Sequence, residues 1–410
     1  MDADVIIVGG AVAGAALANA LGSRGVETLL LEKVSREVHS TRGDLLHPPT
    51  LRILDRWGVL GALHADGALP ITELGVTHAR RGPIARFRLP AADDGPAGRT
   101  VAVPHDRIEA VLFACASRWA SVRCERGVVT ALETDADGRA SGVRFRPHGV
   151  TRNVLHRGRV VVGCDGSQSL VRRSAGIAAE QHPYNHEQVI IGGQGRTELP
   201  AALHWHLDHI GALCVVSRPR EAFRILLTLR LGQRGDLLKR PDPALHDYVL
   251  GRFPMLEQLR FGKADAHVYR LARHLAERFW APGVALVGDS AHATHPAGAT
   301  GMSLAITGAA RLAEAVSPRL LDGASNTDLD HALATYDAER RPAAVVAVQS
   351  NHEQALRIWD GDLFRDPNAY AQAIDPSSGW GVGGTGWGQD PAALTGHMIP
   401  SPKFGRGGRG

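Results

Sequence analysis

The stretch that decides the fold is residues 5–33, VIIVGGAVAGAALANALGSRGVETLLLEK. Its first apolar run, residues 4–9, ends in glycine and predicts a buried parallel strand. Residues 12–24 have the apolar spacing of a helix, with Gly25 as a stop signal. Residues 26–32 predict a second buried strand. A strand, a helix and a second parallel strand form the crossover of doubly wound sheets, so we predict an α/β fold with a doubly wound parallel sheet.

The glycines after the first strand depart from the dinucleotide fingerprint G-x-G-x-x-G. Gly9 and Gly14 fill the first and third places, but Ala11 stands where the second glycine lets the backbone approach a pyrophosphate. One methyl group crowds that approach without preventing it, because the helix N-terminus still offers free N–H groups and its positive dipole end. Glu32, at the end of the second strand, would accept from ribose hydroxyls and repel a 2′-phosphate. The unit therefore favours FAD or NAD(H) over NADP(H), with a crossover that binds no nucleotide as the alternative.

Length, composition and charge exclude several classes of protein. A chain of 410 residues with 44% hydrophobic residues predicts two domains, or one domain with a large insertion. It has no uncharged apolar run of about 18 residues, and Asp2 and Asp4 precede the first apolar stretch where a signal peptide carries positive charge, so we expect a cytoplasmic protein. The net charge of +4 comes from scattered arginines, which does not indicate nucleic-acid binding. Four cysteines without a CxxC pair indicate reduced thiols.

Two further strands end in acidic turns. Residues 160–173, VVVGCDGSQSLVRR, run from an apolar strand into a turn at Asp165. Residues 284–305, VALVGDSAHATHPAGATGMSLA, place Asp289 at the end of a buried strand, before a loop and a helix that starts near Gly301. An acid at the carboxyl end of a strand lies where ligands bind in such sheets. The loop and the helix N-terminus would direct N–H groups at one point, which suits a developing anion.

The chain thus has a glycine motif at residues 9–14, a DG motif at Asp165-Gly166 and a GD motif at Gly288-Asp289. In this order and at this separation, the three motifs resemble those of the single-component FAD-dependent aromatic hydroxylases, the flavoprotein monooxygenases of the para-hydroxybenzoate hydroxylase type. Residues 277–292, ERFWAPGVALVGDSAH, are similar to the lead-in to the family's GD motif. Residues 336–344, YDAERRPAA, are similar to a segment common after it, and residues 40–54, STRGDLLHPPTLRIL, to its Arg-Gly stretch. The likeness covers residues 1–178 and 268–350.

The resemblance implies FAD as cofactor, NADPH or NADH as reductant, and O2 as co-substrate. Reduced flavin would form a C4a-hydroperoxide whose distal oxygen hydroxylates a hydrophobic, phenolic or polycyclic small molecule. It implies a GR2-type FAD-binding domain with an inserted antiparallel-sheet substrate domain, and no metal. The expected FAD-binding domain comprises residues 1–70, 100–178 and 268–355, the substrate domain residues 71–99 and 179–267, and a partly disordered, Gly- and Pro-rich tail residues 375–410.

The resemblance also assigns roles to single residues. Gly9 to Gly14 would cradle the pyrophosphate, and Glu32 would hold the adenosine ribose. Asp289 would bind the ribityl chain, Pro296 would lie beside the flavin ring, and backbone N–H groups near Gly301 would face its N1–O2 edge. The predicted cofactor-binding residues are Gly9, Gly10, Ala11, Val12, Ala13, Gly14, Glu32, Lys33, Arg42, Arg107, Asp165, Arg172, Asp289, Pro296, Gly301 and Met302.

No catalytic residue is assigned. His39, His47, His295 and Pro296 are candidates by neighbourhood alone, and a structural role is the alternative for each histidine.

Patterns elsewhere predict the other elements. Residues 49–63 and 106–120 each predict one helix, and further helices are expected from residue 301 and over 327–357. From about 178 to 267, alternating residues and short turns predict antiparallel strands.

Residues 204–209, HWHLDH, fit the HxHxDH pattern of metallo-β-lactamase-type zinc hydrolases. On a strand, His204, His206 and Asp208 would share one face, and a pocket wall or a solvent face is the alternative to a metal site. An FAD-dependent reductase or dehydrogenase of a lipid-like substrate and a non-catalytic binding protein of the same fold also remain open. The WxWxIP motif of flavin halogenases is absent.

Overall fold

The computed structural model describes residues 2–33, 43–89, 95–195, 202–233, 237–239 and 241–375. Arg42, His39 and all but the first residue of the tail predicted for 375–410 lie outside the described residues. The strands are β1 (Ala3–Val8), β2 (Thr28–Glu32), β3 (Leu45–Leu46), β4 (Leu69–Pro70), β5 (Glu73–His78), β6 (Gly82–Arg88), β7 (Val101–Ala102), β8 (Val122–Thr134), β9 (Ala140–Pro147), β10 (Val154–Gly163), β11 (Ala179–Gln194), β12 (Ala202–Leu207), β13 (Ala212–Ser217), β14 (Ala222–Arg230), β15 (Arg260–Ala276), β16 (Trp280–Ala281), β17 (Val284–Leu286) and β18 (His292–Ala293). The α-helices are α1 (Val12–Gly22), α2 (Pro48–Arg56), α3 (Val59–Ala65), α4 (His105–Ala116), α5 (Leu170–Ser174), α6 (Asp242–Arg252), α7 (Gly301–Leu321), α8 (Asn326–Ala355) and α9 (Pro367–Ala373).

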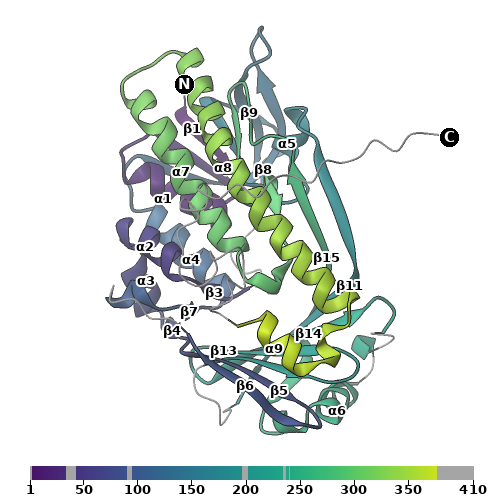
Figure 1. The fold of residues 1–410 in the computed structure, drawn as a ribbon. Helices are drawn as coiled ribbons and strands as arrows, with labels where there is room; N and C mark the ends of the chain where they lie inside the picture. Colours follow the sequence, from purple (N-terminus) through teal and green to yellow (C-terminus); the bar gives the residue numbers. More distant parts are fainter. Residues whose placement is uncertain are drawn as a thin grey trace, which may run out of the picture.

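The first sheet has a parallel centre. β1 pairs in parallel with β2 and β10, β2 with β8, and β10 with β17, while β9 and β16 add antiparallel pairings. The small residues of α1 are all buried and let the helix pack closely against α4 and α7, and α7 packs in turn against α8. This is the predicted crossover built into the predicted doubly wound sheet (Figure 1).

The second sheet has eight strands in the order β18-β15-β11-β14-β13-β12-β5-β6. The predicted antiparallel strands between 178 and 267 form most of it, but β5 and β12 pair in parallel, which the alternation did not indicate. One face packs on a cluster that includes residues 355–374, and the other is covered by α6. β11 and β15 run from the first sheet to the second (Figure 1).

Two local predictions were wrong. The single helix expected over 49–63 is two helices, α2 and α3, because Gly58 between them adopts the left-handed conformation (φ 69°) that ends a helix. Residues 242–252 lie within the region where antiparallel strands were expected, but they form α6. Pro243, in the first turn of this helix, is at a position that favours proline.

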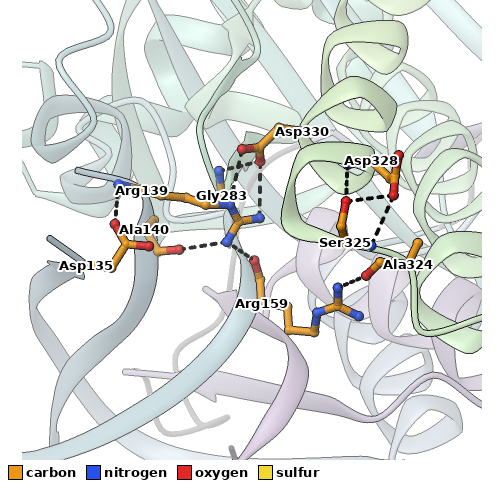
Figure 2. A network of polar contacts seen from close by, with 9 residues as sticks. All are labelled: Asp135, Arg139, Ala140, Arg159, Gly283, Ala324, Ser325, Asp328 and Asp330. Atoms are coloured by element: carbon orange, nitrogen blue, oxygen red, sulfur yellow. Dashed lines mark hydrogen bonds and ion pairs between the residues drawn. The ribbon is translucent and has the colours of Figure 1, made fainter. Parts of the chain in front are cut away.

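The start of α8 is fixed to the first sheet by a polar network (Figure 2). Arg139 donates to Asp330 with its Nε (3.1 Å) and to the Arg159 carbonyl with Nη1 (2.8 Å). The Asp330 carboxylate also accepts from the Gly283 N–H (2.9 Å). Ser325 and Asp328 form a capping box at the helix N-terminus. One carboxylate therefore connects α8 to the β9 and β17 regions.

Among the described residues, no helix combines the length and the hydropathy that crossing a membrane requires.

Candidate FAD site

Two loops meet at the carboxyl ends of β1 and β10, and the glycines of the first loop have no room for a side chain. Gly9 has a φ of 103°, and a Cβ there would lie 2.4 Å from the carbonyl oxygen of Cys164. A Cβ at Gly14 would lie 1.8 Å from the carbonyl oxygen of Gly9. Both contacts are far shorter than real Cβ contacts, so these glycines are required by close packing of the turn, the helix and the neighbouring strand.

The loop after β17 joins the same edge. Gly288 (φ 70°) would place a Cβ 2.7 Å from the Cβ of Ala13, so the GD motif lies directly against the first turn of α1. The hydroxyl of Ser290 donates to the Gly163 carbonyl at the end of β10. The three motifs, at residues 9–14, 165–166 and 288–289, are thus adjacent in space at the edge where ligands bind in doubly wound sheets.

Asp165 and Arg172 support these loops. The Asp165 carboxylate accepts from the Ser169 hydroxyl (2.5 Å) and from the Leu170 N–H (2.7 Å), and so caps α5. The buried Arg172 guanidinium donates to the carbonyls of Ser290 (2.8 Å) and Ser167 (2.8 Å), and burial lowers its pKa. Arg172 thus holds the loop after β10 to the loop after β17, whereas Asp165 caps α5 within its own loop. The predicted contacts of both side chains with the cofactors stay predictions.

The N-terminus of α1 is open. Ala11 is the N-cap residue, is exposed, and provides no side-chain cap, and the first turn has no acidic residue. The Gly10 N–H donates to the carboxylate of Glu32, which places the end of β2 beside the turn. Ala11 is therefore not part of the packed glycine contacts, and the backbone N–H groups that follow can donate to a phosphate. Lys33 is exposed beside Glu32, and its carbonyl accepts from His148 (3.0 Å).

The connection from β17 to α7 contains the other predicted residues. It passes through the turn Pro296–Gly298 and then Ala299, which adopts a left-handed conformation (φ 50°). His47, 1% exposed, lies against this loop: burial lowers its pKa to about 4, and a hydrogen bond to the Ala299 backbone partly offsets that effect. Gly301 begins α7, and Met302 packs partly buried behind it.

Asp289 lies in the 3₁₀ turn Gly288–Ser290 and is partly exposed at the same edge. Arg107, at the start of α4, is half exposed and forms an ion pair with Asp66 of the neighbouring loop. The structure therefore brings together the predicted residues of the glycine, DG and GD motifs, while Arg107 is engaged with a carboxylate.

Residues 2–351 match the family described as FAD binding domain. The chain belongs to that family.

The chain is also similar to proteins named as hydroxylases and monooxygenases. The ubiquinone hydroxylase UbiL of Rhodospirillum rubrum is 28% identical, with 88% of this chain and 82% of that protein covered. A rifampicin monooxygenase of Rhodococcus hoagii is 26% identical over 87% of this chain and 71% of its own length. Among solved structures, PqsL of Pseudomonas aeruginosa, a probable FAD-dependent monooxygenase, has a TM-score of 0.77 and 25% identity, covering 90% of this chain and 98% of that one. The predictions of the doubly wound fold, of FAD and of an FAD-dependent monooxygenase are confirmed.

His204, His206 and Asp208 of the HWHLDH stretch lie on the side of the second sheet that faces α6, whereas Trp205 and Leu207 lie on the other side, in the cluster that includes residues 355–374. His204 and His206 are buried neighbours, with ring centroids 4.6 Å apart, so the solvent-face interpretation was wrong. Asp208 is held by Arg252, with Nε at 2.5 Å and Nη2 at 2.7 Å from its oxygens. Burial alone would raise the pKa of Asp208, but the hydrogen bonds from Arg252 lower it overall. In the described part of the chain, no three His, Cys, Asp or Glu side chains form a group that could hold a metal ion.

A cluster of histidine and tyrosine rings in this flavoprotein was not predicted from the sequence. His182, Tyr184 and His186 alternate along β11 and form ring contacts with His295 and His352, from distant parts of the chain. The alternation H-x-Y-x-H over 182–186 was a visible signal of one polar strand face, but nothing in the sequence indicated which residues it meets.

Proposed function

We propose that this flavoprotein hydroxylates a hydrophobic, phenolic or polycyclic small molecule, with O2 as the oxygen source and NADPH or NADH as the reductant. The observation that carries the proposal is the convergence of three loops at one sheet edge. Gly9 packs there against the Cys164 backbone, and Gly288 against Ala13, so closely that neither position has room for a side chain. The open N-terminus of α1 lies at the same edge and supplies N–H donors for a pyrophosphate.

Within this proposal each predicted residue has a positioning role. The N–H groups of residues 11–14 hold the pyrophosphate, Glu32 accepts from the adenosine ribose, and Asp289 accepts from the ribityl chain. Pro296 restricts the position of the isoalloxazine ring, and the N-terminus of α7 at Gly301 stabilises negative charge on the ring through the helix dipole. FAD, when bound, accepts a hydride from the nicotinamide and activates O2 for transfer to the substrate.

We propose that the substrate binds beside the apolar cluster that packs between this loop and the inner face of the second sheet. The cluster includes Trp205, Trp359 and Tyr370, and Ala299 of the loop packs against it. Aromatic and aliphatic walls of this kind bind apolar rings and exclude water, which protects activated oxygen. By their names, relatives act on ubiquinone, rifampicin and anhydrotetracycline, which supports a ring-containing, hydrophobic substrate. We also propose that residues 71–99 and 179–267 form the substrate domain.

The test begins with the visible absorption spectrum of the purified protein and the identity of the released chromophore. We expect a flavin spectrum and FAD. Oxidation of NADPH and of NADH is then followed together with oxygen consumption, using phenol, 1-naphthol and a hydroxyanthraquinone as probes. Stimulated consumption of both reductant and oxygen with a hydroxylated product supports the proposal. Turnover that proceeds equally without oxygen would instead favour the reductase of a lipid-like substrate, and a protein that refuses added FAD would reject the site.

A further inference from the structure

A cluster of rings connects the second sheet to the loop before α7. β11 contributes His182, Tyr184 and His186, the loop contributes His295, and α8 contributes His352. The Tyr184 ring meets the His295 ring edge-on, with centroids 4.8 Å apart, and its hydroxyl bonds His352 Nδ1 (3.1 Å). The pairing of β11 with β15 is interrupted between Pro183 and Glu187, at the level of the cluster, as bulges near functional sites often are.

Hydrogen bonds in this cluster fix the protons on two imidazole rings. His295 Nδ1 accepts from the Ala297 N–H (3.1 Å), so its proton is on Nε2. That nitrogen donates to His186 Nε2 at 2.9 Å, which leaves the His186 proton on Nδ1. His186 Nδ1 in turn donates to the side-chain oxygen of Asn185 (3.2 Å), which is at the surface. The order of donors and acceptors is complete only if both rings are neutral.

The turn that His295 caps is in a conformation that other groups must maintain. Ala299, directly after Pro296–Gly298, has a φ of 50°, and the left-handed region costs a non-glycine residue about 1–2 kcal/mol. The described groups that hold this loop are His295 through Ala297, His47 through the Ala299 backbone, and Asn351 through the Thr300 hydroxyl (3.2 Å). The loop connects β17 to α7 at the ligand-binding edge of the sheet, so its conformation sets the shape of that edge.

We infer that His186 is a positioning residue that holds the Pro296–Gly298 turn through His295, and that this contact exists only while both imidazoles are neutral. The inference rests on the proposed function in one respect: the turn lies against the bound flavin. His186 belongs to the second sheet and lies 109 positions from His295. The contact therefore transmits the position of the substrate-side sheet to the cofactor-side loop.

The surroundings explain why the neutral forms are held. The rings of Tyr184, His295 and Trp359 face His186. Burial lowers the pKa of His186 to about 4, with Asp360 opposing this effect and Arg230 adding to it. Burial also lowers the pKa of His295, helped by His186 and His352. A proton on the Nε2 of His186 would leave two N–H groups facing each other. When the turn separates from His186, the exposed imidazoles have a pKa of about 6.5. The separated form therefore binds more protons than the form with the contact between about pH 6.5 and 4, and the contact is lost as the pH falls through this range.

The experiment compares three variants at pH 7 and pH 5. His186→Leu removes the acceptor, His186→Gln keeps an acceptor oxygen that does not titrate, and His182→Leu makes the same apolar change on the same strand face without touching the turn. The readouts are the hydrogen-exchange protection of the peptide containing residues 292–302, the dissociation constant for FAD of each apoprotein, and the flavin absorption spectrum.

We expect the wild type and His182→Leu to be protected at pH 7 and less protected at pH 5. His186→Leu should be unprotected at both pH values and bind FAD about tenfold more weakly, as for one lost hydrogen bond. His186→Gln should be protected at pH 7 and should lose less protection at pH 5 than the wild type, because His295 is then the one imidazole of the pair that still titrates.

Protection and FAD affinity in His186→Leu equal to those of the wild type at both pH values would overturn the inference. If His186→Leu does not fold, the comparison rests on His186→Gln, whose protection at pH 5 must exceed that of the wild type. A wild type that binds no FAD would reject the proposed function, while the exchange of the turn would still test the contact itself.

Discussion

Gly14 is the residue with the least room in the cofactor site. Its absent side chain allows α1 to start directly over the carbonyl of Gly9, and the whole turn takes its shape from that approach. A single methyl group would have to displace backbone rather than a flexible side chain.

We therefore expect Gly14→Ala to lose FAD and to destabilise the protein by about 2–4 kcal/mol, a size typical of strain in a packed core. The released flavin content and urea unfolding measure the two effects. Gly61→Ala is the control, because a Cβ at Gly61 in α3 meets nothing within 4 Å and alanine favours the helix. A Gly14→Ala protein that retains full FAD and stability would show that the turn can shift.

His206 is a second residue whose side chain has a measurable effect on the free energy of unfolding. Among the described residues, neither of its ring nitrogens has a hydrogen-bond partner, although the side chain is 2% exposed. Burial lowers its pKa to about 3. We expect His206→Leu to stabilise the protein by about 1 kcal/mol at pH 7, because an unpaired polar group leaves the core, and by more at pH 5.

The matched control is His204→Leu. His204 Nε2 bonds the Thr77 hydroxyl (2.8 Å), so that variant should be destabilised. Urea unfolding at both pH values separates the two. Destabilisation of both variants to the same extent would indicate that His206 has a polar role.

At the scale of elements, α8 depends on its first turns. The Arg139 side chain is 9% exposed and that of Asp330 21%, and the carboxylate also holds the Gly283 N–H. Removing one member of a largely buried pair leaves the other charge without its partner, which costs more than the pair contributes.

Asp330→Ala should lower the free energy of unfolding by about 2–3 kcal/mol. Asp328→Ala is the comparison, because Asp328 belongs to an exposed capping box that contributes about 1 kcal/mol. Urea unfolding gives both values. Equal losses in the two variants would mean that the network in Figure 2 adds nothing beyond a helix cap.

Elements were predictable where local pattern alone forms them. The crossover over residues 3–32 followed from its apolar runs and stop signals, and α7 and α8 from long helical spacing. The break between α2 and α3 was not predictable, because the apolar spacing continues through Gly58 although the backbone leaves the helical conformation there. The parallel pairing of β5 with β12 joins segments more than 120 residues apart, and no local pattern specifies such a partner.

The same limit applies to the site. Gly9 and Gly14 were found because the close approach of backbone requires glycine at fixed spacing, and Asp289 because it stands at the carboxyl end of a buried strand, where ligands bind. His186 was not found, because its partner His295 lies on another element and a lone histidine carries no signal of what it meets.

At the scale of the whole molecule, buried neutral histidines set the response to acid. Burial lowers the pKa values of His47, His186 and His204 to about 4 and those of His206 and His292 to about 3. In the unfolded chain each has a pKa of about 6.5. Between those values the unfolded state binds more protons, so stability falls as the pH falls.

We expect the free energy of unfolding to decrease by several kcal/mol between pH 6.5 and pH 5, since each such histidine contributes up to about 1.4 kcal/mol per pH unit. Urea unfolding at half-unit pH intervals measures the slope of the free energy of unfolding against pH. His206→Leu should reduce this slope by the contribution of one bound proton. A flat profile across this range would show that the histidines titrate in the native state.

The two long strands of the second sheet have a mechanical consequence. β11 and β15 pair from Ala179–Ala276, next to the first sheet, to Gln194–Arg260, in the second, with irregularities between Pro183 and Glu187 and between Ile191 and Gly193. The paired segments resist rotation of the backbone, so bending of one sheet against the other would concentrate at these two irregularities. The two strands therefore form a stiff connection between the sheets that can flex at two defined points, one of them beside the ring cluster of His186.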